Sequence, residues 1–241
     1  MENRVIIDPT FDFSTGLNGK DPDIYSKTLK EYHKFLWSQD LPVGGKFELN
    51  KCDPKRYLVF HGRAGDHFLS SDSITNSFRD RKGKISLVIN QVNEIDSVLV
   101  ESFYKLNSTI GGYLVFPGNR IGDKATINAE RGLNYYISDR FDLTLECIRR
   151  HYLSIENPLQ NVLNRYAPFF ALFKDFKNYV DFFYLNDLVT QDYSAVKYFM
   201  SSENLFKESP LPQDVDSYLI YRENSMKFTQ SRNNRLASLS S

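Results

Sequence analysis

The densest group of polar side chains in the sequence lies between residues 118 and 151. Its members suited to an anionic ligand are Asn119, Arg120, Lys124, Arg131, Arg140, Arg149 and Arg150. Arginine makes planar, bidentate contacts with phosphate and carboxylate groups. The turn at 116–120 contains Gly118 and Asn119, which tolerate positive φ and let backbone N–H groups converge on an anion. The pattern predicts an anion site, and the alternative is an ordinary hairpin turn followed by a helix-terminal glycine.

Two carboxylates in the same stretch have the spacing of a catalytic or cation-binding pair. Asp142 and Glu146 are four residues apart, so a helix would place them close enough to share a proton or a divalent cation. His151 is the nearest candidate acid or base. The alternative is a structural ladder in which Asp139, Asp142 and Glu146 pair with arginines along one helix, each pair contributing about 0.2–0.5 kcal/mol.

The sequence lacks the motifs of several common sites. It contains no HExxH or CxxC pattern for zinc and no GxSxG elbow, and the cofactor remains unknown. Gly111-Gly112 precedes an expected strand rather than a helix, so it does not have the context of a phosphate-binding loop. Aromatic runs at 169–173 and 182–184 could stack nucleobases, but neighbouring aspartates favour a role in core packing.

Overall charge and composition exclude broad classes of partner. Lys plus Arg and Asp plus Glu each total 30, giving a net charge of +0. This balance disfavours binding to nucleic acid or to a membrane surface through a global field. No apolar segment is long enough to span a bilayer, the N-terminus lacks a signal-peptide layout, and there are only two cysteines. We expect a cytoplasmic protein with a small anionic ligand as its partner. The sequence leaves open whether the protein forms a homo-oligomer.

The elements that must position these residues follow from apolar spacing. Alternation and turn residues predict strand pairs at 57–70 and 113–128, the second with strands at 113–116 and 124–128. Ser71 or Asp72 is expected to cap a following helix. Helical windows cover 23–36, 139–153, 159–173, 175–189 and 214–235. Within 159–173, Pro168 should break the helix.

Together these elements predict an α+β fold, with a small antiparallel sheet in the first half packed against an aromatic-rich helical second half. We expect a single globular domain over 1–241. Residues 1–22 would form a loop-like arm and residues 236–241 a frayed tail.

Several stretches resemble one family of proteins. They are the segments at 25–29, 68–73, 109–112, 116–121, 126–132, 139–152 and 187–189. On these residues the chain resembles the DUF6994 type, a family of uncharacterised bacterial proteins. The resemblance implies one domain covering nearly the whole chain, and it implies no activity, ligand or catalytic residue.

Three functions follow from these observations. The first is binding of a phosphate- or nucleotide-like anion by the Arg/Asn cluster. The second is a metal- or acid/base-dependent hydrolase or transferase acting on a phosphate-containing substrate, which leaves open whether the protein is an enzyme. The third is a non-enzymatic interaction protein in which the arginines and carboxylates only brace the fold.

Overall fold

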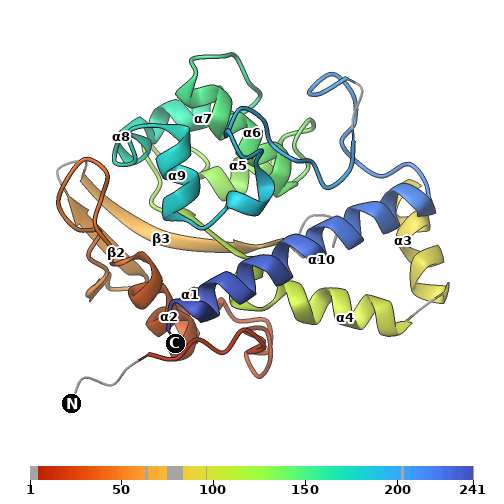
Figure 1. Ribbon diagram of the computed structural model, residues 1–241, viewed down its shortest axis with the longest axis horizontal. Coiled ribbons are helices and arrows are strands. Elements are labelled where there is room, and N and C mark those ends of the chain that lie inside the picture. The colour runs from red at the N-terminus through yellow and green to blue at the C-terminus, as the bar shows by residue number, and fades with distance from the viewer. Residues whose placement is uncertain (1–4, 63–64, 75–83, 96, 202–203, 241) are drawn as a thin grey trace.

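The structure, a computed structural model, describes residues 5–62, 65–74, 84–95, 97–201 and 204–240. The chain has the predicted α+β architecture, in which a small antiparallel sheet is flanked by helices (Figure 1). The strands are β1 (Lys51–Cys52), β2 (Leu58–Gly62), β3 (Gly65–Ser73) and β4 (Tyr113–Pro117), in the order β1-β2-β3-β4.

β3 is longer than its neighbours and is paired by different strands along its two halves. Its first half pairs with β2, from Phe68 opposite Val59 to Gly65 opposite Gly62. Its second half pairs with β4, from Leu69 opposite Pro117 to Ser73 opposite Tyr113. Among the described strands, none continues β2 along the second half of β3. That edge is therefore open to side chains from other elements.

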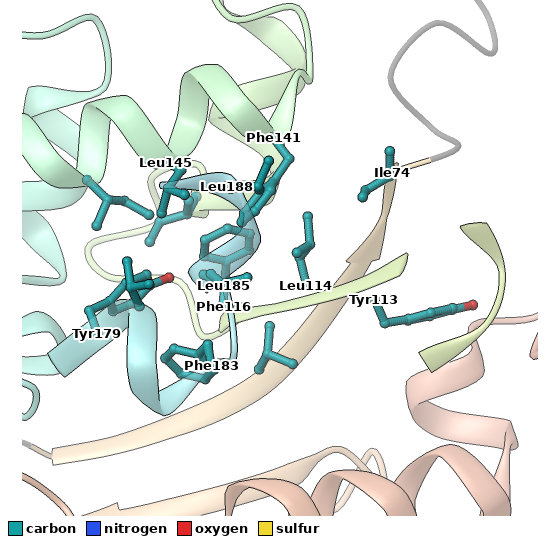
Figure 2. Packing of buried hydrophobic residues seen from close by; sticks show 14 of the residues in the cluster. Ile74, Tyr113, Leu114, Phe116, Phe141, Leu145, Tyr179, Phe183, Leu185 and Leu188 are labelled. Carbon is teal, nitrogen blue, oxygen red and sulfur yellow. The ribbon is translucent and has the colours of Figure 1, made fainter. Parts of the chain in front are cut away.

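Short helices cover one face of the sheet (Figure 1). They are α5 (Ile127–Leu133), α6 (Phe141–Tyr152), α7 (Gln160–Arg165), α8 (Ala167–Ala171), α9 (Phe176–Phe182) and the 3₁₀ turn η3 (Asn186–Leu188). Phe116 of β4 packs with Phe141, Tyr179 and Phe183 from these helices (Figure 2). The aromatic runs of the second half thus contribute to the core, where each large ring buries much apolar area.

The remaining helices lie around the other side and the ends of the sheet (Figure 1). They are α1 (Pro22–Tyr25), α2 (Lys27–Trp37), α3 (Lys84–Ile95), α4 (Ser97–Asn107), the 3₁₀ turn η2 (Ile110–Gly112) and the long α10 (Val215–Ser238). α10 contacts α3, α4 and η2 and continues through part of the predicted tail at 236–241. The hydroxyl of Ser240 accepts a hydrogen bond from the amide of Ile7, which brings the two ends of the chain together.

The prediction of a strand at 124–128 was wrong. Thr126 instead caps α5, since its hydroxyl accepts a hydrogen bond from the amide of Ala129 (3.3 Å). Residues 127–133 form a helix with Ile127 buried beneath it. The alternation that suggested a strand was carried by few residues, and the capping hydroxyl decided the local structure.

Two other expected boundaries also differ. α6 begins at Phe141 rather than at 139, because Ser138 and Asp139 have positive φ (46° and 66°) and cannot continue a right-handed helix. The helix expected from 23 to 36 is interrupted at Ser26, whose side chain caps α2. Ser71 and Asp72 lie inside β3, so neither is a helix cap. Pro168 does break its window, at the junction of α7 and α8.

Candidate functional site

Arg131 is the most completely bonded of the predicted anion ligands. It is buried, and its Nη1 donates to Oδ2 of Asp72 at 3.0 Å. Its Nε donates to Oγ1 of Thr144 (2.8 Å), and its Nη2 donates to the carbonyl of Asp139 (3.0 Å). The guanidinium therefore ties α5 to β3 and to the turn before α6.

Arg140 and Asp142 form a buried ion pair. Nε and Nη2 of Arg140 donate to the two carboxylate oxygens of Asp142, at 3.1 and 2.5 Å. The same carboxylate accepts the amide of Phe199 at 2.9 Å, and Arg140 also donates to the carbonyl of Pro210. This pair fastens the start of α6 to the segment that leads into α10.

Glu146 is also surrounded by arginines rather than by a partner carboxylate. It is buried and accepts from Arg149 at 2.7 and 2.9 Å and from Arg150 at 2.8 Å. Asp142 thus pairs with Arg140, and Glu146 pairs with Arg149 and Arg150, so the two carboxylates have separate partners. Among the described residues, no group of three or more His, Cys, Asp or Glu side chains is arranged to hold a metal ion.

The other predicted site residues are dispersed. Arg120 and Lys124 are exposed on the turn after β4. Asn119 has a structural part, because its side-chain oxygen accepts the amide of Phe68 and its carbonyl accepts the hydroxyl of Tyr166. His151 packs against the ring of Phe170, and burial lowers its pKa. The described arginines therefore do not converge on one cavity.

A different region contains a polar cavity of about 550 Å³. It lies where the N-terminal arm crosses the open edge of β3. Its polar lining includes Lys20 and Asp21 from the arm, Ser71, Asp72 and Ser73 from β3, and Tyr113 from β4. We call it the acidic pocket. The arm is held over it by Phe13, which is buried against the rings of Tyr32 and Tyr113.

Tyr113 directs its hydroxyl toward the acidic pocket. Its side chain extends away from Phe116 and Phe141 of the apolar cluster (Figure 2). Tyr113 is only 6% exposed, yet no residue in the described part of the chain hydrogen-bonds its hydroxyl. Burial and four carboxylates, those of Asp23, Asp12, Asp21 and Asp72, raise the pKa of this phenol. The hydroxyl therefore stays protonated, and its oxygen can accept a hydrogen bond from a molecule in the pocket.

Behind the pocket lies the buried carboxyl of Asp23, in α1. It receives the amide of Ser71 at 2.7 Å and the hydroxyl of Ser71 at 2.5 Å. The amide belongs to the edge of β3 that β2 leaves open, so Asp23 replaces the missing strand there. Burial raises the pKa of Asp23 to about 7, although the two bonds from Ser71 oppose the shift.

His33, on α2, completes this cluster. Its Nε2 lies 3.4 Å from Oγ of Ser71 and 3.8 Å from Oδ1 of Asp23, and its Nδ1 accepts a hydrogen bond from the indole of Trp37 (2.9 Å). Burial, followed by the charge of Arg232, lowers the pKa of His33 to about 3. His33 is therefore a neutral imidazole that carries its proton on Nε2.

Sequence reasoning missed the acidic pocket because its parts are far apart in the chain. Asp23 and Ser71 are 48 residues apart, and Tyr113 follows 42 residues later. One local signal was present. Asp21-Pro22-Asp23 has the pattern of a capped helix start, with Pro in the first turn and an acidic residue after it.

Comparison with known proteins places the chain in a family. The sequence profile of DUF6994, described as a family of unknown function, matches residues 7–236. The chain belongs to this family. No curated protein and no solved structure shows significant similarity to it. None of the described helices has both the length and the apolar character needed to cross a membrane.

Proposed function

We propose that this DUF6994 protein binds a small cationic molecule, such as an alkylamine or a guanidinium compound, in the acidic pocket. The Tyr113 hydroxyl carries the proposal, because it opens into the cavity and no described residue hydrogen-bonds it, so its oxygen is available to accept an N–H of a ligand. The cavity of about 550 Å³ falls in the usual size range of small-molecule sites.

The charges around the pocket support a cationic ligand. Asp21 accepts hydrogen bonds from the amide of Asp23 and the hydroxyl of Tyr57, both uncharged donors. Asp72 has the cation Arg131, but Arg131 also lies 3.4 Å from Asp139. Lys20 is exposed, and its ammonium sits 5.3 Å above the ring of Tyr25. Among the described lining residues there are thus two carboxylates, Asp21 and Asp72, and one cation, Lys20, a balance that favours positive charge.

The test is calorimetric titration with methylguanidinium and 1,4-diaminobutane, with uncharged 1,4-butanediol as the matched control. We expect the cations to bind and the diol not to bind. Asp72→Asn and Tyr113→Phe should each weaken binding about tenfold, as expected for loss of one charge or one buried hydrogen bond of about 1.4 kcal/mol. Tyr135→Phe, at an exposed tyrosine outside the pocket, should leave binding unchanged. Equal binding of the diol and the diamine would contradict a cationic ligand.

A second candidate is the anion site predicted from the arginine cluster, now confined to Arg150. This residue lines a separate cavity of about 590 Å³ together with Lys207 and Tyr136. Glu146 already engages its Nε, and Phe206 lies 4.9 Å from its guanidinium. Inorganic phosphate and pyrophosphate should then raise the melting temperature of the wild type but not of Arg150→Gln. Arg120→Gln, outside this cavity, is the control, and unchanged melting of the wild type would exclude the anion site.

A further inference from the structure

Asp23 is connected to the acidic pocket through one residue. Its carboxylate is only 6% exposed, and both of its hydrogen bonds to β3 come from Ser71. Ser71 itself lines the pocket. A change in the protonation of Asp23 therefore alters the hydrogen bonds that the Ser71 hydroxyl can offer to a molecule in the pocket.

Among the residues that the structure describes, no lysine or arginine pairs with Asp23. The two charged side chains that act on Asp23 are Asp21, at the start of α1, and Asp72, on β3. Both are negative. The phenols of Tyr57 and Tyr113 lie close enough to sense its charge. Arg131 is bonded to Asp72 on β3. From α10, Arg232 lies beyond His33 and donates to the carbonyls of Gly111, Tyr113 and Phe183.

His33 does not supply the missing positive charge. Its Nδ1 accepts the Trp37 indole N–H, so a second proton on the ring would break that bond and place two N–H groups against each other. When this pair takes up a further proton, the proton therefore binds to the carboxyl group of Asp23 and not to the imidazole of His33.

We propose that a cation entering the acidic pocket displaces one proton from Asp23, with the Ser71 hydroxyl linking the two events. This inference rests on the proposed function and adds a regulation by pH to it. The ligand supplies the counter-charge that the protein does not, and the carboxyl proton passes to the solvent.

The Ser71 hydroxyl can link the two events because it has one proton and two acceptor positions. While Asp23 holds its proton, the carboxyl O–H donates to Oγ of Ser71, and the serine proton is free to point into the pocket. Once Asp23 is ionised, Ser71 donates to the carboxylate, and its remaining lone pair faces the pocket as an acceptor. An ammonium or guanidinium N–H needs an acceptor, so it favours the ionised state.

The direction of the pH dependence follows from this scheme. In the free protein the pKa of Asp23 is about 7, and a bound cation lowers it. Binding therefore releases a proton between the lowered pKa of the bound state and pH 7, and releases none well above pH 7. Over that range the apparent affinity should rise about tenfold per pH unit, and above pH 7 it should level off.

The test is titration calorimetry with methylguanidinium, whose own pKa lies above 12, so that it has no proton to release. Each titration is repeated in two buffers of different ionisation enthalpy, at pH 6 and at pH 8.5. We expect release of about 0.9 proton per ligand at pH 6 and less than about 0.1 at pH 8.5. Asp23→Asn should release no proton and bind more weakly, because its amide donates to Ser71 as the protonated carboxyl does.

The outcomes separate this inference from the proposed function. Binding at pH 6 without proton release overturns the coupling but leaves the cation site intact. Absence of binding by both cations at both pH values overturns the two together. If Asp23→Asn does not fold, the buffer series on the wild type decides the question. Ser71→Ala then provides the second variant, in which binding should lose its pH dependence between pH 6 and 7.

Discussion

Ser71, His33 and Asp23 are the residue types of a hydrolase triad, but their hydrogen bonds run differently. In a triad the histidine accepts the serine proton on one nitrogen and donates from the other to the carboxylate. Here Nδ1 of His33 accepts from Trp37, so Nε2 carries the proton and cannot act as the base. Asp23 accepts directly from Ser71. Surrounding aspartates would also destabilise a serine alkoxide, so the arrangement suits proton exchange better than nucleophilic attack.

Trp37 should control the protonation of His33. In Trp37→Phe, Nδ1 loses its donor and can accept a proton, so the pKa of His33 should rise from its value of about 3. Followed by ¹⁵N NMR between pH 5 and 8, the His33 ring should keep the shifts of a neutral imidazole in the wild type, apart from small changes as Asp23 titrates, and should move toward those of an imidazolium at the low end of the range in Trp37→Phe.

The matched control for this prediction is Phe183→Leu. It removes a ring 5.4 Å from the Trp37 ring but leaves the indole N–H in place. His33 should keep the shifts of a neutral imidazole in that variant, as in the wild type. If they move as they do in Trp37→Phe, the loss of packing, and not the loss of the hydrogen bond, is responsible.

At the residue level, the sequence predicted which side chains are charged and close together, but not which partners they choose. The pairing of Glu146 with Arg149 and Arg150 was foreseeable, because both arginines lie within four residues on one helix. The pairing of Arg131 with Asp72 was not, since it joins residues 59 positions apart. Contacts of that kind depend on the sheet register, which a local pattern does not specify.

At the scale of elements, capping residues decided the boundaries that apolar spacing left open. Asp175 caps α9, and Asp214 forms a capping box with Ser217 at the start of α10. Both helices begin within two residues of their predicted starts. Thr126 has the same function at α5, but a run of alternating residues around it was interpreted as a strand. Caps were therefore the more reliable signal in this chain.

Substitution of Thr126 distinguishes a helix cap from a strand residue. Thr126→Val keeps the shape and the β-propensity of threonine but removes the oxygen that accepts the amide of Ala129. We expect a loss of about 1 kcal/mol in the free energy of unfolding, measured by urea denaturation. Thr126→Ser keeps the cap and should stay within about 0.5 kcal/mol of the wild type. A stabilising Thr126→Val would contradict the cap.

The Gly111-Gly112 pair shows how packing, rather than ligand binding, can require glycine. A Cβ on Gly111 would lie 2.5 Å from the carbonyl oxygen of Thr229, on α10. A Cβ on Gly112 would collide with the backbone of Asn107. The amide of Gly111 also donates to the side chain of Asn233 (2.7 Å). The sequence placed this pair before a strand, which β4 confirms, but the close approach of α10 could be seen only in three dimensions.

At the scale of the whole molecule, α10 joins parts of the chain that are distant in sequence. Arg232, fully buried on this helix, donates to carbonyls of η2, β4 and the end of α9. Burial lowers its pKa to about 9, and the charges of Tyr179 and Asp187 offset this only in part. The equal totals of 30 acidic and 30 basic residues therefore do not mean uniform pairing. Arg232 lies deep in the core, while Asp21 and Asp72 line the acidic pocket with Asp23 behind them.

The same uneven distribution predicts how stability depends on pH. The pKa of Asp23 is raised from 3.8 to about 7, so the folded protein binds the proton more tightly than the unfolded chain does. Its contribution to stability is present below pH 3.8 and is lost as the pH rises to 7. The pKa of His33 is lowered from 6.5 to about 3, so its contribution is present above pH 6.5 and is lost as the pH falls to 3. Between pH 4 and 6.5 the two contributions have opposite slopes.

As the pH rises, the free energies of unfolding of variants at Asp23 and at His33 should therefore change in opposite directions relative to the wild type. Relative to the wild type, the free energy of unfolding of Asp23→Asn should increase by about 1.4 kcal/mol per pH unit between pH 4 and 6, because the falling contribution is removed. That of His33→Gln should decrease by about the same amount per unit, because the rising contribution is removed. Urea denaturation at pH 4, 5 and 6 measures the free energy of unfolding of both variants. Subtracting the wild-type values removes the contributions of titrating groups that all three proteins share. If the pair were an ion pair in the folded state, Asp23→Asn would show no such increase between pH 4 and 6, because an ionised Asp23 with a lowered pKa would lose its contribution only below pH 3.8.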